Sequence, residues 1–579
     1  MHYDLVIRGG TIIDGTGDKP YQGDVAINGR TIAAVGQIDG TGREEIDAGG
    51  RLVTPGFVDV HTHYDGQATW EHTLAPSSNH GVTTIVGGNC GVGFAPCRSD
   101  DRDKLITVME GVEDIPEVVM AAGIPWNWES FPEYLDALDA REFDIDIAMQ
   151  VAHSPLRVFV MGDRGADLEP STEIDRARMA ALVTEAINAG AIGVSTSRSL
   201  NHRAKDGRLA PSVSTAKEEV LALAKGLGAS NGGVFQIITE MEEDPADEMA
   251  LVERIAETSG RPVSFSLAET MENPDSWRST LDALAAMNDR GRNVTAQVFP
   301  RPIGVMMGLD LSLNPILTRP SYAAIKDLPL EERVAIMRDP AFKEKVLAET
   351  PVPDPQPVVN MLVGAVDKLF GLGAEPEYMP DESLRLDNRA AALGKTSISL
   401  AYDLMLEQDG HGLLYLPSAN FATGTPASVR EMMAHRDTVL GLGDGGAHYG
   451  MICDAGFPTF SLAYWCRDAA EDDRFPVEWI VRELTSRPAG IVNMRDRGLV
   501  KQGYKADLNV IDFDRLKLES PRPTYDLPSG GRRLRQLAEG IDATIVSGVV
   551  TYRDGVSTGE LPGRLVRGDG YAPLAATGS

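Results

Sequence analysis

Two histidines, His61 and His63, lie one residue apart in the stretch FVDVHTHYDG, at the end of an apolar run. In a β-strand, residues i and i+2 point to the same side, so the two imidazoles would face one direction. Such a pair suits Zn²⁺ or a similar divalent cation, although an isolated pair also occurs as hydrogen-bonded histidines without a metal. The Pro-Gly turn before this strand and the Tyr-Asp after it favour the metal interpretation.

Two further residues are candidates for the same site. Cys90 ends a second apolar segment, in GGNCGVG, where a divalent cation would deprotonate the thiol and make it a strong ligand. A buried, unreactive cysteine is the alternative. Asp444 ends a late segment, in GLGDGGAH, and its carboxylate can bind a metal and accept a proton from water. A turn or helix-capping aspartate is the alternative there.

Short apolar segments with polar residues at their ends predict the strands that must position these side chains. There are eight of them: 57–63, 83–91, 146–154, 191–198, 234–240, 262–269, 293–300 and 438–448. Helical stretches separate several of them, as buried parallel strands require, so we expect an α/β fold, a (β/α)8 TIM-like barrel whose active-site mouth lies at the strand ends. An open doubly wound sheet is the alternative, weakened by the absence of a GxGxxG motif or P-loop.

The two ends of the chain are rich in short β segments and turns. We therefore expect a small β-sandwich domain built from both termini, residues 1–54 and 497–556. Residues 55–496 would form the barrel, with an insertion over its mouth at 301–437, and 557–579 a C-terminal tail.

The bulk composition restricts the partners. With 54 basic and 85 acidic residues among 579, the formal net charge is −31, which argues against nucleic acid. Four cysteines are too few for a disulfide scaffold. Neither a signal peptide nor an apolar run of about 18 residues is visible, so we expect a cytoplasmic protein without a membrane partner. A small-molecule substrate is expected, and a homo-oligomer is left open.

Several longer motifs carry a resemblance to a known family. They are DLVIRGGTIIDGTG, PGFVDVHTH, GVTTIVGGNCG, GAIGVSTS, GDGGAH and GYKADLNVIDFD. With these motifs the chain resembles the amidohydrolase superfamily over nearly its whole length, and within it the N-acyl-D-amino-acid deacylases. The resemblance implies that His61 and His63 are metal ligands from the first strand and Cys90 a ligand from the second. It implies that Asp444 is both ligand and proton shuttle.

The chain departs from that family at the fifth and sixth strands. Deacylases carry one metal-binding histidine at the end of each, whereas this chain has Ile238 and Leu267 near those positions. No histidine occurs between residues 203 and 410, so a shift in the placement of these two strands cannot supply one. We therefore expect one divalent metal, Zn²⁺ by preference, with the second site lost. Glu240 and Glu269 are alternative oxygen ligands.

Other polar residues at the predicted mouth are candidates for catalysis or substrate binding. His153 and His202 are candidate donors to a substrate oxygen, and Arg198, Arg203 and Lys205 could hold a carboxylate. Tyr449 is expected to line the pocket. A structural histidine and a solvated basic loop are the alternatives.

These residues predict a metal-dependent amidohydrolase that cleaves a C–N amide bond with Asp444 as proton shuttle. An N-acyl amino acid of D configuration as substrate follows from the resemblance alone. A non-hydrolytic enzyme, one directed at lactones or cyclic amides, and a metal-free binding protein are the alternatives.

Overall fold

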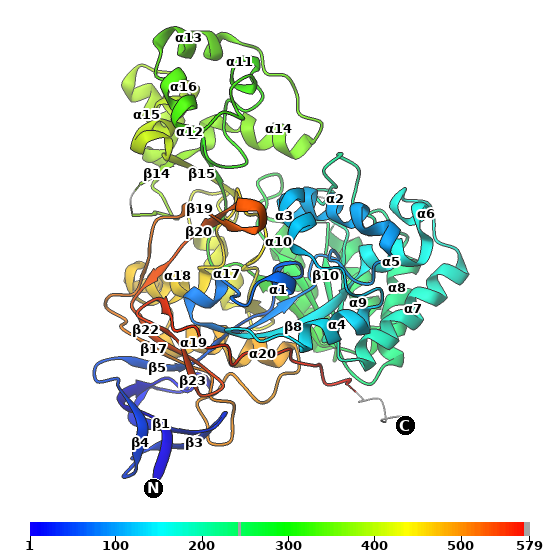
Figure 1. Ribbon diagram of the computed structural model, residues 1–579, viewed down its shortest axis with the longest axis vertical. Helices are drawn as coiled ribbons and strands as arrows, with labels where there is room; N and C mark the ends of the chain where they lie inside the picture. Colours follow the sequence, from blue (N-terminus) through cyan, green and yellow to red (C-terminus); the bar gives the residue numbers. More distant parts are fainter. Residues whose placement is uncertain (241–244, 374, 572–579) are drawn as a thin grey trace.

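A computed structural model of the chain, which describes residues 1–240, 245–373 and 375–571, contains three parts (Figure 1). A β domain holds the first strands and several of the last, a barrel occupies the middle, and a mainly helical cap stands over the barrel at the top of the view. Among the described residues, the structure has no helix that is both long and apolar enough to span a lipid bilayer.

The eight strands predicted for the barrel are all present, in a single parallel sheet ordered β16-β12-β11-β10-β9-β8-β7-β6. Their bounds are β6 (Phe57–Asp59), β7 (Val82–Gly87), β8 (Asp146–Ala152), β9 (Gly193–Ser197), β10 (Val234–Ile238), β11 (Val263–Leu267), β12 (Val294–Val298) and β16 (Thr438–Leu440). Nearly every residue in them is buried. This is expected for barrel strands, because one face packs in the barrel interior and the other packs against the surrounding helices.

The sheet closes on itself between its first and last strands. Just beyond these strands, Thr62 and Gly445 form a parallel β-bridge. The His63 amide donates to the Gly445 carbonyl at 2.8 Å, and the Asp444 amide donates to the His61 carbonyl at 3.1 Å. The predicted (β/α)8 barrel is confirmed, and the open-sheet alternative is wrong because these bonds join the two edges.

Helices follow the barrel strands and cover the outside of the sheet. The long ones after β8, β9, β10 and β11 are α7 (Glu173–Asn188), α8 (Lys217–Ala229), α9 (Pro245–Ser259) and α10 (Ser276–Asp289). Before them lie α1 (Gln67–Trp70), α2 (Arg102–Glu113), α3 (Glu117–Gly123), α4 (Phe131–Asp139), α5 (His153–Met161) and α6 (Asp163–Ala166). After them lie α17 (Ala427–Ala434), α18 (Phe457–Ala463), α19 (Val477–Leu484) and α20 (Ser486–Ile491). Capping fixes some of these starts: the Thr172 hydroxyl and the Asp175 carboxylate form a capping box at α7.

Strands from both ends of the chain build the β domain. Its nine-stranded sheet contains β1 (His2–Ile12), β2 (Tyr21–Asn28), β3 (Thr31–Gly36), β4 (Thr41–Asp47), β5 (Leu52–Pro55), β17 (Leu508–Ile511), β22 (Ile541–Val546), β23 (Val549–Arg553) and β24 (Val556–Ser557). The two halves meet where β5 pairs with β17 in antiparallel register. Two short pairs are separate from this sheet, β18 (Lys517–Leu518) with β21 (Ala538–Glu539) and β19 (Arg522–Leu527) with β20 (Gly531–Arg535), and β19 and β20 lie below the cap (Figure 1).

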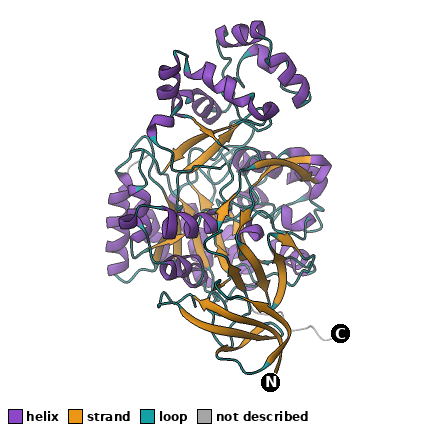
Figure 2. Ribbon diagram, turned by 90° about the vertical axis from the view of Figure 1, so that its left-hand side faces the viewer, coloured by secondary structure: helices purple, strands orange, loops and turns teal. Residues whose placement is uncertain are grey.

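The cap, residues 303–419, is inserted between β12 and β16. Its strands β13 (Ile303–Met307), β14 (Phe370–Leu372) and β15 (Leu413–Ala419) form a small sheet between the cap helices and the barrel (Figure 2). The helices are α11 (Pro320–Ala323), α12 (Leu330–Met337), α13 (Pro340–Ala348), α14 (Pro357–Gly364), α15 (Leu386–Leu393) and α16 (Ser397–Met405). The cap has a hydrophobic core of its own, separate from the barrel core, so it is a unit of its own above the mouth.

A buried ion cluster joins the barrel to the C-terminal segment. The Asp146 carboxylate, at the start of β8, contacts Arg497 at 2.7 Å and Lys505 at 3.1 Å. It also accepts the Arg564 amide at 3.0 Å. Burial opposes ionisation of Asp146, but Lys505 and Arg497 outweigh it and hold its pKa below the usual value. Lys505 also contacts Asp507 at 2.5 Å and Arg497 also contacts Asp496 at 2.9 Å, so Asp146 is the carboxylate that both buried cations share.

We predict that Asp146→Asn lowers the melting temperature by a few degrees, because two buried cations lose the carboxylate that they share, at a cost of about 1.5–3 kcal/mol. Differential scanning calorimetry measures the change. The matched control is Asp496→Asn. The Asp496 side chain contacts the same Arg497 but is 61% exposed, so its loss should cost under about 1 kcal/mol. Equal shifts for the two variants would contradict the assignment.

Candidate metal centre and cavity

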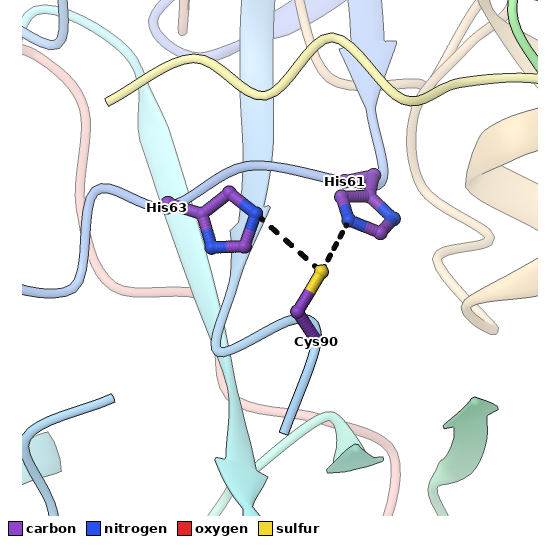
Figure 3. Close-up of side chains that lie close together, drawn as sticks. All are labelled: His61, His63 and Cys90. Atoms are coloured by element: carbon purple, nitrogen blue, oxygen red, sulfur yellow. Dashed lines mark hydrogen bonds between the residues drawn. The ribbon is translucent and has the colours of Figure 1, made fainter. Parts of the chain in front are cut away.

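Four side chains predicted to bind a metal meet at the C-terminal end of the barrel. His61 and His63 follow β6, Cys90 follows β7 and Asp444 follows β16, so three strand ends contribute. Figure 3 shows both imidazoles directed toward the Cys90 sulfur. The donor atoms of His61, His63 and Cys90 all lie within 4.8 Å of one another, and these three side chains are buried.

The distances from the two histidines to the other donors suit one small cation. The Cys90 Sγ lies 3.2 Å from His61 Nε2 and 3.8 Å from His63 Nε2. The Asp444 Oδ1 lies 3.5 Å and 3.6 Å from the same two nitrogens. Ligands at the tetrahedral angle around zinc, with bonds of about 2.0 Å to nitrogen and 2.3 Å to sulfur, stand roughly 3.3–3.5 Å apart. His61, His63 and Cys90 therefore fit Zn²⁺ in both chemistry and spacing, and Asp444 lies close to both histidines as a further donor.

Burial sets the protonation states of the donors. It lowers the pKa of His61 to about 4, with Asp444 opposing and His63 reinforcing the change, and it lowers the pKa of His63 to about 3. Both rings are thus neutral near pH 7 and have a lone pair to offer. Burial, reinforced by Glu113, Asp444 and Asp65, raises the pKa of the Cys90 thiol well above its usual value. A cation would reverse that preference and displace the proton.

The Cys90 loop is held in a conformation that few sequences allow. Cys90 itself has a φ of 55°, in the left-handed region, and Gly88 and Gly91 on either side also have positive φ. A Cβ on Gly88 would lie 2.1 Å from the carbonyl oxygen of Gln150 in β8. The glycines therefore let the loop lie directly on the neighbouring strand, and such strain in a non-glycine residue is concentrated at functional sites.

Two partners of the histidines were not predicted from the sequence. The second ring nitrogen of His61, Nδ1, lies 2.8 Å from the Gln297 side-chain oxygen on β12. Gln297 is held in turn, because its amide donates to the Ser264 hydroxyl at 3.1 Å. The second nitrogen of His63, Nδ1, faces the Glu113 carboxylate at 3.4 Å. The sequence indicates Gln297 only as a polar residue within an apolar barrel strand. Nothing in the sequence indicates a role for Glu113.

A cavity of about 730 Å³ opens above the four donors. Its floor includes His61, His63, Cys90 and Asp444, and cap residues complete the opposite wall. The cap side is largely apolar, with contributions from Ile303, Val305, Val358, Val359, Met361 and Leu362. The volume lies within the range of about 300–1,000 Å³ that is common for small-molecule sites.

Two of the residues predicted to contact substrate line this cavity. His202 is half-buried at its wall, and loss of solvation lowers the pKa of His202 to about 4. Lys205 also lines it, with its ammonium 2.6 Å from Glu110. His448 is a third lining residue with a pKa lowered to about 4 by burial, although Asp444 opposes this.

The other four predicted residues do not line the cavity. His153 is buried and engaged at both ring nitrogens, by Thr196 at 2.8 Å and Glu219 at 2.9 Å. Arg198 is paired with Glu248 at 2.8 Å. Two more are held elsewhere by hydrogen bonds, Arg203 by the Gly207 carbonyl and Tyr449 by the Gln67 side chain. Each was expected at the mouth from its place after a strand, but each side chain turns to a partner outside the cavity.

The ends of the fifth and sixth strands offer the cavity no nitrogen ligand. Ile238 lines it from β10, and Ser266 and Ala268 line it at β11. Glu240 also lines it, with one carboxylate oxygen accepting the Leu200 amide at 2.7 Å. Glu269 does not, because its carboxylate accepts the Ala422 amide at 2.9 Å.

The model of the amidohydrolase family matches residues 44–552. A D-aminoacylase of Alcaligenes xylosoxydans xylosoxydans is 27% identical over 572 residues, which is 97% of each chain.

Solved structures share the fold. A D-aminoacylase structure with a binuclear metal center superposes with a TM-score of 0.65 at 24% identity, covering 98% of this chain and 100% of that one. An N-acyl-D-glutamate deacylase from Bordetella bronchiseptica, complexed with zinc and a phosphonate inhibitor, gives 0.64 at 22% identity with the same coverage. At these identities the likeness extends to the fold.

We predict that Cys90→Ser weakens Zn²⁺ binding by more than the roughly 10–100-fold that an outer-shell change costs, because a thiolate ligand is lost. Competition with a chromophoric chelator measures the affinity. Cys97→Ser is the matched control, since Cys97 is buried in the core and outside the cavity. Unchanged affinity in Cys90→Ser would remove the thiol from the ligand set.

Proposed function

The chain belongs to the amidohydrolase family, and on that premise we propose that it hydrolyses a C–N amide bond at the His61/His63/Cys90/Asp444 centre. The observation that carries the proposal is the convergence of four donors from three strand ends at the floor of one cavity. Functional sites of barrel enzymes lie at this end of the strands.

The four donors would hold one divalent ion. When bound, such an ion supplies Lewis acidity, which lowers the pKa of water and polarises a carbonyl group. Two neutral imidazoles, one thiolate and one carboxylate leave the site with little net charge. His61, His63 and Cys90 have the spacing of ligands to one ion, and Asp444 lies close to both histidines, so we propose a single zinc.

Asp444 is proposed to move the proton. Its side chain is 21% exposed, while those of His61 and His63 are 1% exposed, so the carboxylate is the donor that substrate and water can reach. It accepts a proton from the attacking water and passes it to the leaving amine, which would otherwise depart as a poor anion.

His202 is proposed to face the reacting carbonyl. It lines the cavity and is neutral near pH 7, because its pKa is lowered to about 4. A neutral imidazole can donate one N–H to the oxygen that gains negative charge, and a fixed donor in a site shielded from water is worth more than one in solvent. The apolar cap wall keeps bulk water from that oxygen.

The names of the relatives support an N-acyl-D-amino acid as substrate. Its free carboxylate would need a cation, and Lys205 is the one lysine or arginine among the described residues that line the cavity. We propose that Lys205 leaves Glu110 to bind it.

A second candidate is an uncharged amide, a cyclic amide or a lactone. The observation that favours it is the pairing of Lys205 with Glu110, beside Asp114 and Glu240 in the same cavity. A carboxylate-bearing substrate must compete with these groups, and an uncharged one need not. A panel of N-acyl-D- and L-amino acids beside uncharged amides and lactones separates the two, and hydrolysis in ¹⁸O water must place solvent oxygen in the acid product.

We predict that Asp444→Asn lowers kcat about 10²–10⁴-fold on the best substrate of that panel, since proton transfer is lost. Steady-state kinetics on zinc-loaded protein checks this. Asp437→Asn is the control. Asp437 directly precedes β16 and so lies at the end of the strand opposite to Asp444. Full activity in Asp444→Asn would rule out the proposed shuttle.

A further inference from the structure

Glu113 is a buried carboxyl group for which the proposed mechanism has no use. It is the last residue of α2 and is 1% exposed. Neither of its carboxylate oxygens has a hydrogen-bond partner among the described residues. Burial raises its pKa well above the usual value, with Asp444 and Asp65 reinforcing the effect. Leaving such a group buried and unpaired is costly, so its position calls for a compensating interaction.

Two histidines of the site face this carboxyl group. Its Oε1 lies 3.4 Å from His63 Nδ1, and its Oε2 lies 3.5 Å from His448 Nε2. These are ion-pair distances slightly longer than hydrogen bonds, and His63 Nδ1 has no other partner. The backbone reinforces the pairing, because the His448 amide donates to the Glu113 carbonyl.

The position of the His63 proton follows from this geometry. His63 Nε2 is the nitrogen that faces Cys90 and Asp444, so it must carry the lone pair if it is to bind a cation. The ring proton then lies on Nδ1, which is directed at Glu113. His61 has the same arrangement with Gln297 in the role of acceptor. Metal-binding histidines generally donate their second N–H to a carboxylate, a carbonyl or water, and such partners fix both tautomer and ring orientation.

We propose that Glu113 is a positioning residue of the metal centre. It accepts the His63 Nδ1 proton through one oxygen and holds His448 at the cavity wall through the other. A single carboxylate thereby fixes the orientation of both His63 and His448. This inference rests on the proposed function in one respect, the presence of a cation at the four donors.

The next residue fastens α2 to the loop that carries His448. The Asp114 carboxylate accepts the Gly450 amide at 2.9 Å and bonds the Ser312 hydroxyl at 3.0 Å. Asp114 has a φ of 50°, so the chain turns sharply where the helix ends. The Glu113 backbone is therefore held from two sides. A residue that positions the His63 ring precisely needs such support.

The test is Co²⁺ and Zn²⁺ affinity and the Co²⁺ visible spectrum of full-length Glu113→Met, which keeps an unbranched side chain but has no oxygen to accept the His63 proton. We expect metal binding about 10–100-fold weaker, because outer-shell partners contribute that much, and a changed ligand-field band because His63 is less firmly oriented. Glu110→Met is the matched control. It makes the same substitution three residues earlier on α2 and also lines the cavity, but the Glu110 carboxylate pairs with Lys205.

A double-mutant cycle with His63→Ala assigns the effect. If Glu113 acts through His63, Glu113→Met has little further effect on Co²⁺ affinity once the ring is absent. If the methionine variant does not fold, Glu113→Ala takes its place in the same cycle.

Three outcomes would overturn the inference. They are unchanged affinity and spectrum in Glu113→Met, equal losses in Glu110→Met, and a second bound ion that disappears in Glu113→Met, since Glu113 would then be a ligand. Failure of the unsubstituted protein to bind any metal is a different result, because it rejects the proposed function itself.

Discussion

The closure of the barrel between β16 and β6 is the contact on which the site depends. The backbone bonds that join His61 to Asp444 and His63 to Gly445 bring the ends of the first and last barrel strands together. Without them the carboxylate would lie at one edge of an open sheet and the histidines at the other. The same bonds fix the direction of both segments, so the imidazoles and the carboxylate converge without any contribution from loop flexibility.

Burial then gives these donors their chemical character. Desolvation keeps both histidines neutral and disfavours the charged forms of Cys90, Glu113 and Asp65. A protein that concentrates so many ionisable groups away from water is destabilised by them unless a cation compensates. A divalent ion at the four donors would compensate most of that cost at once. Perturbed groups of this kind at the floor of a cavity are typical of functional sites.

Much of the fold and of the candidate site could be predicted from the sequence. The eight strands have short, apolar signatures, and His61, His63, Cys90 and Asp444 each follow such a strand, so their place at the mouth follows from chain order. The partners Gln297 and Glu113 could not be predicted, because their roles depend on which side chain lies opposite a ring nitrogen in three dimensions. The same limitation applies to Arg198 and His153. Their positions after strands were predicted correctly. Their partners could not be predicted, because Arg198 pairs with Glu248 and His153 with Glu219 on helices distant in the sequence.

The most direct test of the central claim is anomalous diffraction at the zinc absorption edge from crystals of the full chain purified without chelator. The account predicts one strong peak per chain, surrounded by His61 Nε2, His63 Nε2, Cys90 Sγ and the Asp444 carboxylate. A peak elsewhere in the cavity, such as beside Glu240, or a second peak of equal height would contradict a single centre at the ends of the first, second and eighth strands.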